Sequence, residues 1–135
     1  MGLSKKGFVI VVLVAILLIG AVILAIYITN LNDYRSRIQN MQFSNIDIAS
    51  IPDGTYTGES DANLVYAKVE VVVLDGTLVS IDLLRHDNGR GDSAEQIIDD
   101  MIEQQALDVD AISGATSSSK VIRKAIENAL TGNRD

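Results

Sequence analysis

The 135-residue chain contains no cysteine, no tryptophan, a single histidine (His86) and a single proline (Pro52). Without cysteine, lipoprotein attachment through a Cys thiol is excluded. No group of His and carboxylate residues has the spacing of a metal site, and no Ser-His-Asp arrangement suggests a hydrolase. The sequence therefore predicts neither a metal centre nor a catalytic triad.

Basic charge is also scarce. All 18 acidic residues follow residue 28, whereas only nine of the 11 basic residues do, so the part after residue 28 is strongly acidic. Nucleic-acid backbones attract basic surfaces, which argues against nucleic acid as a partner. An acidic surface otherwise indicates little beyond a soluble domain.

Charge is absent from Phe8 to Ile28, where every residue except Gly20 and Tyr27 is apolar. As a helix with a rise of ~1.5 Å per residue, this run is roughly 31 Å long, which is enough to cross the ~30 Å core of a bilayer. It is longer than the apolar region of a signal peptide, and Ala25-Ile26-Tyr27-Ile28 is a poor cleavage site. We therefore predict an uncleaved transmembrane anchor over residues 1–28, with a cleaved signal peptide as the alternative.

Lys5 and Lys6 precede the apolar run and favour a cytoplasmic N-terminus. Arg35 and Arg37 on the other side weaken this bias, although Asp33 lies beside them. The expected localisation is the cell membrane, in a single pass, with the C-terminal domain extracytoplasmic. The lack of cysteine is compatible with an oxidising compartment.

Residues 29–50 are expected to form a stalk and linker. An apolar stripe at helical spacing runs along residues 29–42, through Leu31, Tyr34, Ile38 and Met41. It predicts either a continuation of the membrane helix or a short helix that pairs with itself or a partner, and it is too short to argue a coiled coil. Residues 43–50 lack periodicity, and the turn signal Pro52-Asp53-Gly54 opens the compact domain, which is expected over residues 51–131.

Three strands are predicted next. Residues 55–59 are rich in strand formers, and in residues 64–74 every second residue from Val65 to Val73 is apolar, which gives one continuous apolar face. Asp75-Gly76 is typical of a type I′ hairpin turn. Residues 77–84 are predicted to form the second strand of this hairpin, with Val79, Ile81 and Leu83 on one face.

Two helices follow a loop that is predicted over residues 85–91. Asp92 and Glu95 have the spacing of a capping box, which predicts the start of the first helix. This helix should end near Gln105. Residues 107–110 are short and alternating, a strand or an extended entry into the last helix. That helix should begin between Thr116 and Ser118, carry a broad apolar stripe from Val121 to Leu130 that packs on the sheet, and end at Gly132. The predicted fold is α+β: a transmembrane helix, then a small antiparallel sheet covered by two helices.

Ahead of the last helix stands Asp110-Ala111-Ile112-Ser113-Gly114-Ala115-Thr116-Ser117-Ser118-Ser119-Lys120. Glycine lets the backbone approach a ligand, and a helix start offers free N–H groups and the positive end of its dipole. The segment is therefore typical of a phosphate site. Residues of these types also serve simply to cap a helix, and the chemistry alone does not separate the two.

Residues 110–116 resemble the Asp-x-x-Ser/Thr-Gly-Ala-Thr flavinylation motif of FMN-binding domains. These domains occur in the sodium-pumping NADH:quinone reductase, in the Rnf electron-transport complex and in small membrane-anchored bacterial proteins. The similarity extends from Asp53-Gly54-Thr55-Tyr56-Thr57-Gly58 through Asp75-Gly76 and the His86 region to Leu130. The 110–116 segment is its most specific part.

The resemblance implies FMN as the cofactor, carried on Thr116 as a phosphoester. An FAD:protein FMN transferase, using a divalent metal, would attach it and release AMP. The resemblance makes the surrounding residues candidates for cofactor binding: Asp110, Ser113, Gly114, Ala115, Ser117 and Ser118. We expect Gly114 to give the loop its conformation, Ala115 to leave room for the donor, and the serines to hold the phosphate.

Three side chains keep more than one interpretation. Asp110 fixes the loop or is read by the transferase, or it caps the helix. Lys120, one turn beyond Thr116, neutralises phosphate or is solvated. Family members often carry a His in a His-x-Glu-Thr setting, but this chain reads His86-Asp87-Asn88-Gly89. His86 therefore contacts the flavin or is a surface or turn histidine.

Together these patterns predict a membrane-anchored flavoprotein that acts as an extracytoplasmic electron-transfer relay. The chain has no Gly-x-Gly-x-x-Gly fingerprint, so we expect a redox carrier rather than a stand-alone enzyme that oxidises nicotinamide. Expected partners are the transferase, membrane redox proteins and the lipid bilayer. The alternatives are a protein that binds FMN without a covalent bond, as a sensor or flavoprotein, and a cofactor-free adaptor of a membrane complex.

Overall fold

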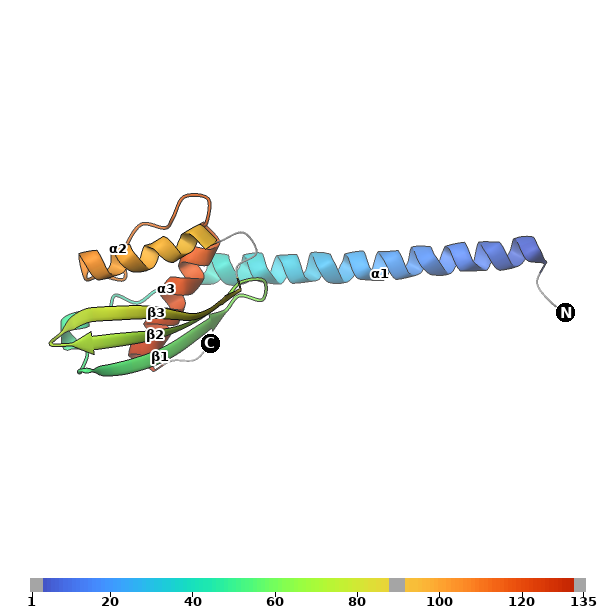
Figure 1. Cartoon of the computed structure of the whole chain (residues 1–135). Coiled ribbons are helices and arrows are strands. Elements are labelled where there is room, and N and C mark those ends of the chain that lie inside the picture. The colour runs from blue at the N-terminus through green and yellow to red at the C-terminus, as the bar shows by residue number, and fades with distance from the viewer. Residues whose placement is uncertain (1–3, 88–91, 133–135) are drawn as a thin grey trace.

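The structure, a computed structural model, describes residues 4–87 and 92–132. One long helix, α1 (Lys5–Asn40), leads into a small domain at the C-terminal side of the chain (Figure 1). The domain is a three-stranded antiparallel sheet in the order β1 (Gly54–Asp61), β2 (Tyr66–Leu74) and β3 (Thr77–Asp87). Its helices are α2 (Ile97–Gln104), α3 (Thr116–Thr131) and two short 3₁₀ helices, η1 (Ile48–Ser50) and η2 (Asp92–Gln96). The predicted α+β class is confirmed.

The α1 helix begins with a cap in which the Gly7 N–H donates to Ser4 Oγ at 3.2 Å. From Phe8 to Ile28 its apolar side chains are exposed, so no other part of the described chain covers them. Its length and composition are sufficient to cross a membrane.

The last turns of α1 pack on the domain. Ile38 is buried, and Tyr34 and Met41 lie against the same core. The predicted helical continuation beyond the apolar run is therefore confirmed, and its apolar stripe faces the chain's own domain.

The Asp75-Gly76 hairpin forms as predicted, with φ of 52° and 69° at these two residues. On β2 the alternate residues from Ala67 to Val73 are buried, also as predicted. On β3 the register shifts, because Leu78 pairs with Val73 whereas Ser80 pairs with Val72. Val79 is the extra residue of this bulge and is 52% exposed.

The prediction that Val79 shares the core face is therefore wrong. A bulge adds one residue to one strand and reverses the alternation of faces on either side of it. Leu78 fills the core position instead and is 1% exposed. Beyond the bulge, Ile81 is buried and Leu83 packs against the core, in agreement with the prediction.

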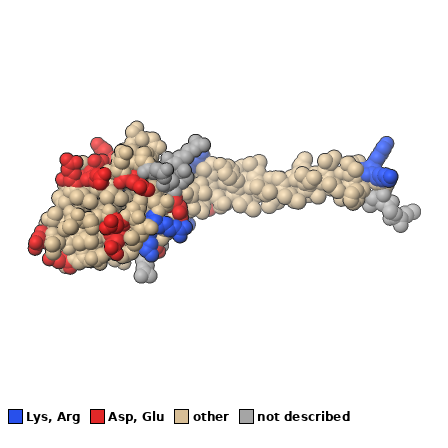
Figure 2. All heavy atoms as spheres, in the orientation of Figure 1, with Lys and Arg blue, Asp and Glu red and all other residues tan. Residues whose placement is uncertain are grey.

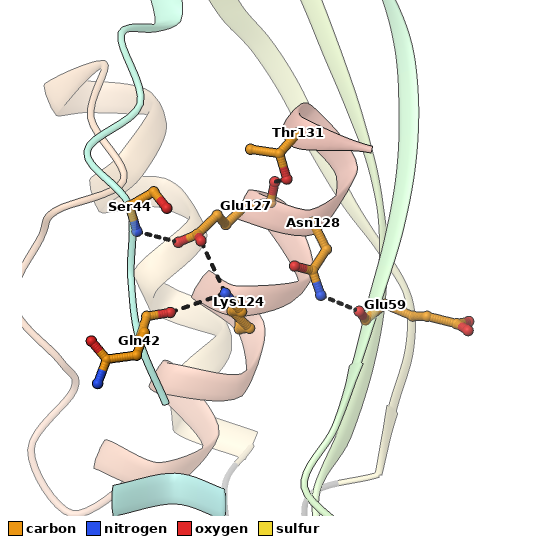
Figure 3. A network of polar contacts seen from close by, with 7 residues as sticks. All are labelled: Gln42, Ser44, Glu59, Lys124, Glu127, Asn128 and Thr131. Carbon is orange, nitrogen blue, oxygen red and sulfur yellow. Dashed lines mark hydrogen bonds and ion pairs between the residues drawn. The ribbon is translucent and has the colours of Figure 1, made fainter. Parts of the chain in front are cut away.

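The α3 helix lies across the buried face of the sheet, and Gly58 of β1 makes this close approach sterically feasible. A Cβ on Gly58 would stand 2.3 Å from both the Ala125 carbonyl oxygen and the Ala129 nitrogen. The Asn128 Nδ2 group also donates to the Glu59 carbonyl at 2.9 Å (Figure 3). The apolar stripe predicted for this helix is buried, and the helix ends at Gly132, as predicted, with φ of 72°.

A polar network around the buried Glu127 fixes the segment between α1 and η1 to α3 (Figure 3). The Glu127 side chain is 4% exposed and accepts from the Ser44 N–H and from Lys124 Nζ, each at 3.0 Å. Lys124 Nζ also donates to the Gln42 carbonyl at 2.9 Å. The segment that lacks periodicity in the sequence is thus held by hydrogen bonds to a helix some 80 residues further along.

Candidate functional site

The site is built around the start of α3, which Figure 1 shows at the end of the domain where α1 enters. Residues 112–115 form a turn that delivers the chain into the helix, closed by a 3.0 Å hydrogen bond from the Ala115 N–H to the Ile112 carbonyl. Gly114 has φ of +80°, as the third residue of a type II turn requires. A Cβ at Gly114 would meet nothing within 4 Å, so the backbone conformation, rather than lack of space, favours glycine.

The Ser119 hydroxyl ties this turn to the helix. It accepts from the Ile112 N–H at 3.1 Å and donates to the Ala115 carbonyl at 2.9 Å. Ser119 is 1% exposed; its bond to the Ala115 carbonyl is buried, and its bond to the Ile112 N–H is partly buried. Ser119 belongs to the run of hydroxyl residues but was not predicted as a site residue, because nothing in the sequence distinguishes it from its neighbours.

The first N–H groups of α3 are free within the described chain. Helical bonding begins with the Ser119 N–H, which donates to the Ala115 carbonyl at 2.9 Å, and no side chain caps the helix. The N–H groups of Thr116, Ser117 and Ser118 therefore remain available. With the positive end of the helix dipole they make this point suited to an anion.

Exposure separates the candidate residues into two groups. Asp110, Ser113, Gly114 and Thr116 are exposed, and Ser117 is half-buried. Ala115 and Ser118 are buried, at 6% and 4% exposure. The Ala115 methyl group belongs to the core, so its small size serves packing here. Asp110 makes no hydrogen bond to the helix start among the described residues, so the alternative that it caps α3 is wrong.

Residues 65–131, which include β2, β3 and the whole site, match the family model of the FMN-binding domain. The chain belongs to the FMN-binding domain family. Its cofactor is FMN. No curated protein matches the chain.

The start of α3 in this FMN-binding domain fits the phosphate of FMN. Three N–H groups are without a partner at this helix start, Thr116 is exposed, and the space around Gly114 is open. Lys120 lies one turn further on and is half-buried.

His86 lies in a strand, which overturns the prediction of a loop for residues 85–87, while residues 88–91 of that loop lie outside the described residues. The cause is a second bulge, since Leu83 pairs with Val69 but Arg85 pairs with Lys68, leaving Leu84 as the extra residue. This shift places His86 opposite Ala67, on the buried face of the sheet. A bulge leaves no mark in the alternation of the sequence, so this position could not be predicted from it.

The His86 side chain is 3% exposed, and its Nδ1 atom lies 3.1 Å from Glu95 Oε1. Glu95 belongs to η2, and η2 packs against α3. The interpretation of His86 as a surface or turn histidine is therefore wrong. The side chain of Asp92 lies outside the described part of the chain, so the predicted capping box stays a prediction.

A hollow that was not predicted from the sequence lies further along α3. Arg123 stacks over the Phe43 ring at 4.3 Å and pairs with Asp108 at 2.8 Å. The cavity beside it measures about 460 Å³ and is lined by residues 44–49, Gly76, residues 105–108 and Arg123. Thr116, Lys120 and Arg123 follow the spacing of a single helix face, so two cations lie along α3 beyond the Thr116 hydroxyl.

Proposed function

We propose that the domain carries FMN covalently on Thr116 and works as an electron-transfer relay anchored at the extracytoplasmic face of the cell membrane. The observation that carries the proposal is that Thr116 is exposed at a helix start with three free N–H groups, within a domain whose cofactor is FMN.

The attachment step balances without any change in oxidation state. The Thr116 hydroxyl oxygen attacks the FMN phosphorus of FAD, the P–O bond of the pyrophosphate breaks, and AMP leaves while the hydroxyl proton is released. A separate FAD:protein FMN transferase with a divalent metal catalyses this step. The chain itself presents the hydroxyl on a fixed turn and supplies N–H donors for the phosphoester, which still bears negative charge.

Bound FMN supplies one- and two-electron redox chemistry, and the protein supplies its position. The long apolar α1 holds the domain at the membrane, and α3 begins on the side of the domain that faces α1 (Figure 1). Lys5 and Lys6 favour the orientation in which the domain is extracytoplasmic. A membrane donor and an external acceptor are therefore the partners that we propose.

The attachment is tested by expressing the full chain with the transferase and measuring flavin fluorescence in a denaturing gel. We expect a fluorescent band for the wild type and for Ser117→Ala, which removes the neighbouring hydroxyl, and none for Thr116→Ala. A fluorescent Thr116→Ala band would contradict attachment at Thr116. A yellow native protein that loses all flavin on denaturation would contradict the covalent bond and support the non-covalent alternative.

The orientation is tested by adding a protease to spheroplasts of the expressing cells. We expect digestion of the domain without lysis, while a cytoplasmic marker protein stays intact. Protection of the domain until lysis would contradict the extracytoplasmic location and, with it, the relay that we propose.

A further inference from the structure

The turn between β1 and β2 lies beside α1 at the level where its apolar run ends. Asn63 Nδ2 donates to the Asn30 carbonyl oxygen at 3.3 Å. Asn30 follows Ile28, the last residue of the apolar run, by two positions, which is about 3 Å along a helix axis. If α1 spans a bilayer with this run in the core, the turn reaches the membrane surface.

The turn is tightly built, and its tip presents a leucine. The Asn63 N–H donates to Asp61 Oδ1 at 2.7 Å, and the Ala62 N–H donates to the Val65 carbonyl at 2.9 Å. Ala62 and Val65 are buried, whereas Leu64 between them is 46% exposed. An exposed leucine on a short, ordered turn is well placed to enter the interfacial layer of a bilayer.

The domain is held to α1 by several contacts besides the one at Asn30. Arg37 Nη1 donates to the Asp61 carbonyl at 3.2 Å, and Ile38 is buried in the domain core. The Glu127 network fixes the segment that follows α1. The height of the turn relative to α1 is thus set by the fold.

The distribution of charge also favours contact between the β1–β2 turn and the membrane surface. Figure 2 shows Lys and Arg side chains gathered where the domain meets α1, with a few Asp or Glu atoms beside them, while most Asp and Glu side chains are spread over the rest of the visible face of the domain. Arg35 and Arg37 belong to this end of α1. Anionic headgroups attract basic residues close to a membrane surface, whereas the acidic remainder of the domain is repelled.

We infer that the β1–β2 turn, residues 61–65, is a lipid-contact site, in which Leu64 inserts among the headgroups and holds the domain at one height above the bilayer. This inference rests on α1 spanning the membrane, as in the proposed function, but it is independent of the flavin. Its partner is the bilayer surface itself.

The test uses the lack of tryptophan in the chain. Three full-length variants, Leu64→Trp, Leu18→Trp in the apolar run and Leu74→Trp at the far hairpin, each receive one fluorophore at a position that is exposed in the structure. They are reconstituted in vesicles of phosphatidylcholine and phosphatidylglycerol containing lipids brominated at shallow or deep positions. Far-UV circular dichroism checks that each variant is folded.

We expect Leu18→Trp to be quenched by deep bromines and Leu64→Trp to be quenched by shallow ones, with blue-shifted emission. Leu74→Trp should be quenched by neither. Emission and quenching of Leu64→Trp that match those of Leu74→Trp would overturn the inference while leaving α1 in the membrane. An unquenched Leu18→Trp would overturn it by showing that α1 lies outside the bilayer, and the in-gel flavin assay would still report separately on Thr116.

Discussion

The Ala129 backbone nitrogen of α3 lies 2.3 Å from the position that a Cβ on Gly58 would occupy. Helix and strand are in backbone contact here, so no side chain larger than hydrogen fits without moving α3. Because α3 also carries Thr116 at its other end, this contact in β1 sets the position of the candidate site.

Gly58→Ala should destabilise the domain by about 3 kcal/mol or more, at the upper end of the usual cost of overpacking. Thermal and urea unfolding of the full chain in detergent measure the change. Gly54→Ala is the matched control in the same strand, since the atoms nearest to its Cβ would be those of the Tyr56 side chain, at an ordinary 3.5 Å. Equal stability of the two variants would contradict the close approach.

Gly114→Ala should cost about 1–2 kcal/mol, because the residue is held at φ of +80°, where a Cβ is disfavoured. It should also lower the yield of flavin attachment, since relaxing the turn moves Ser113 and Thr116. Gly132→Ala is the control, with φ of +72° and equally open surroundings. We expect a similar loss of stability there with unchanged flavin fluorescence. Equal effects on attachment would show that Gly114 acts only through stability.

Ser119→Ala should destabilise the domain by about 1–3 kcal/mol, because it leaves the partly buried Ile112 N–H without its acceptor. Hydrogen exchange of the Ile112 amide should accelerate. Ser117→Ala, which removes a half-buried hydroxyl two residues earlier, should change stability by less than about 0.5 kcal/mol. Unchanged exchange at Ile112 in Ser119→Ala would argue against the hydroxyl as the tie between turn and helix.

Glu127→Ala should cost about 3 kcal/mol, since it leaves Lys124 mostly buried without its carboxylate and the Ser44 N–H without its acceptor. Glu127→Gln keeps an oxygen for Ser44 and should cost less. Chemical unfolding gives the energies, and hydrogen exchange at Ser44 shows whether the segment after α1 detaches from α3. If both variants protect Ser44 as the wild type does, the network does not hold this segment.

Local patterns predicted much of the fold. The Asp75-Gly76 turn, the alternation on β2 and the apolar stripe of α3 all specify structure within a few residues, and all three form as expected. The site at the start of α3 could also be predicted from the sequence, because a glycine followed by hydroxyl residues and a helix is a local pattern.

Features that depend on contacts between distant segments were not predictable. The bulges at Val79 and Leu84 change the faces of β3 without any change in its composition, and one of them buries His86. The roles of Ser119 and Glu127 likewise follow from tertiary placement, since each looks like an ordinary polar helix residue in the sequence. Phe43 and Arg123 meet across 80 positions, a contact that no local pattern encodes.

The most direct test of the central claim is mass spectrometry of the full chain, purified from cells that also express the transferase, followed by peptide mapping. We predict a mass higher by one FMN less one water, carried on the peptide that contains Thr116, and an unmodified mass for Thr116→Ala. An unmodified wild-type chain under these conditions, or the added mass on a peptide that lacks Thr116, would contradict the claim.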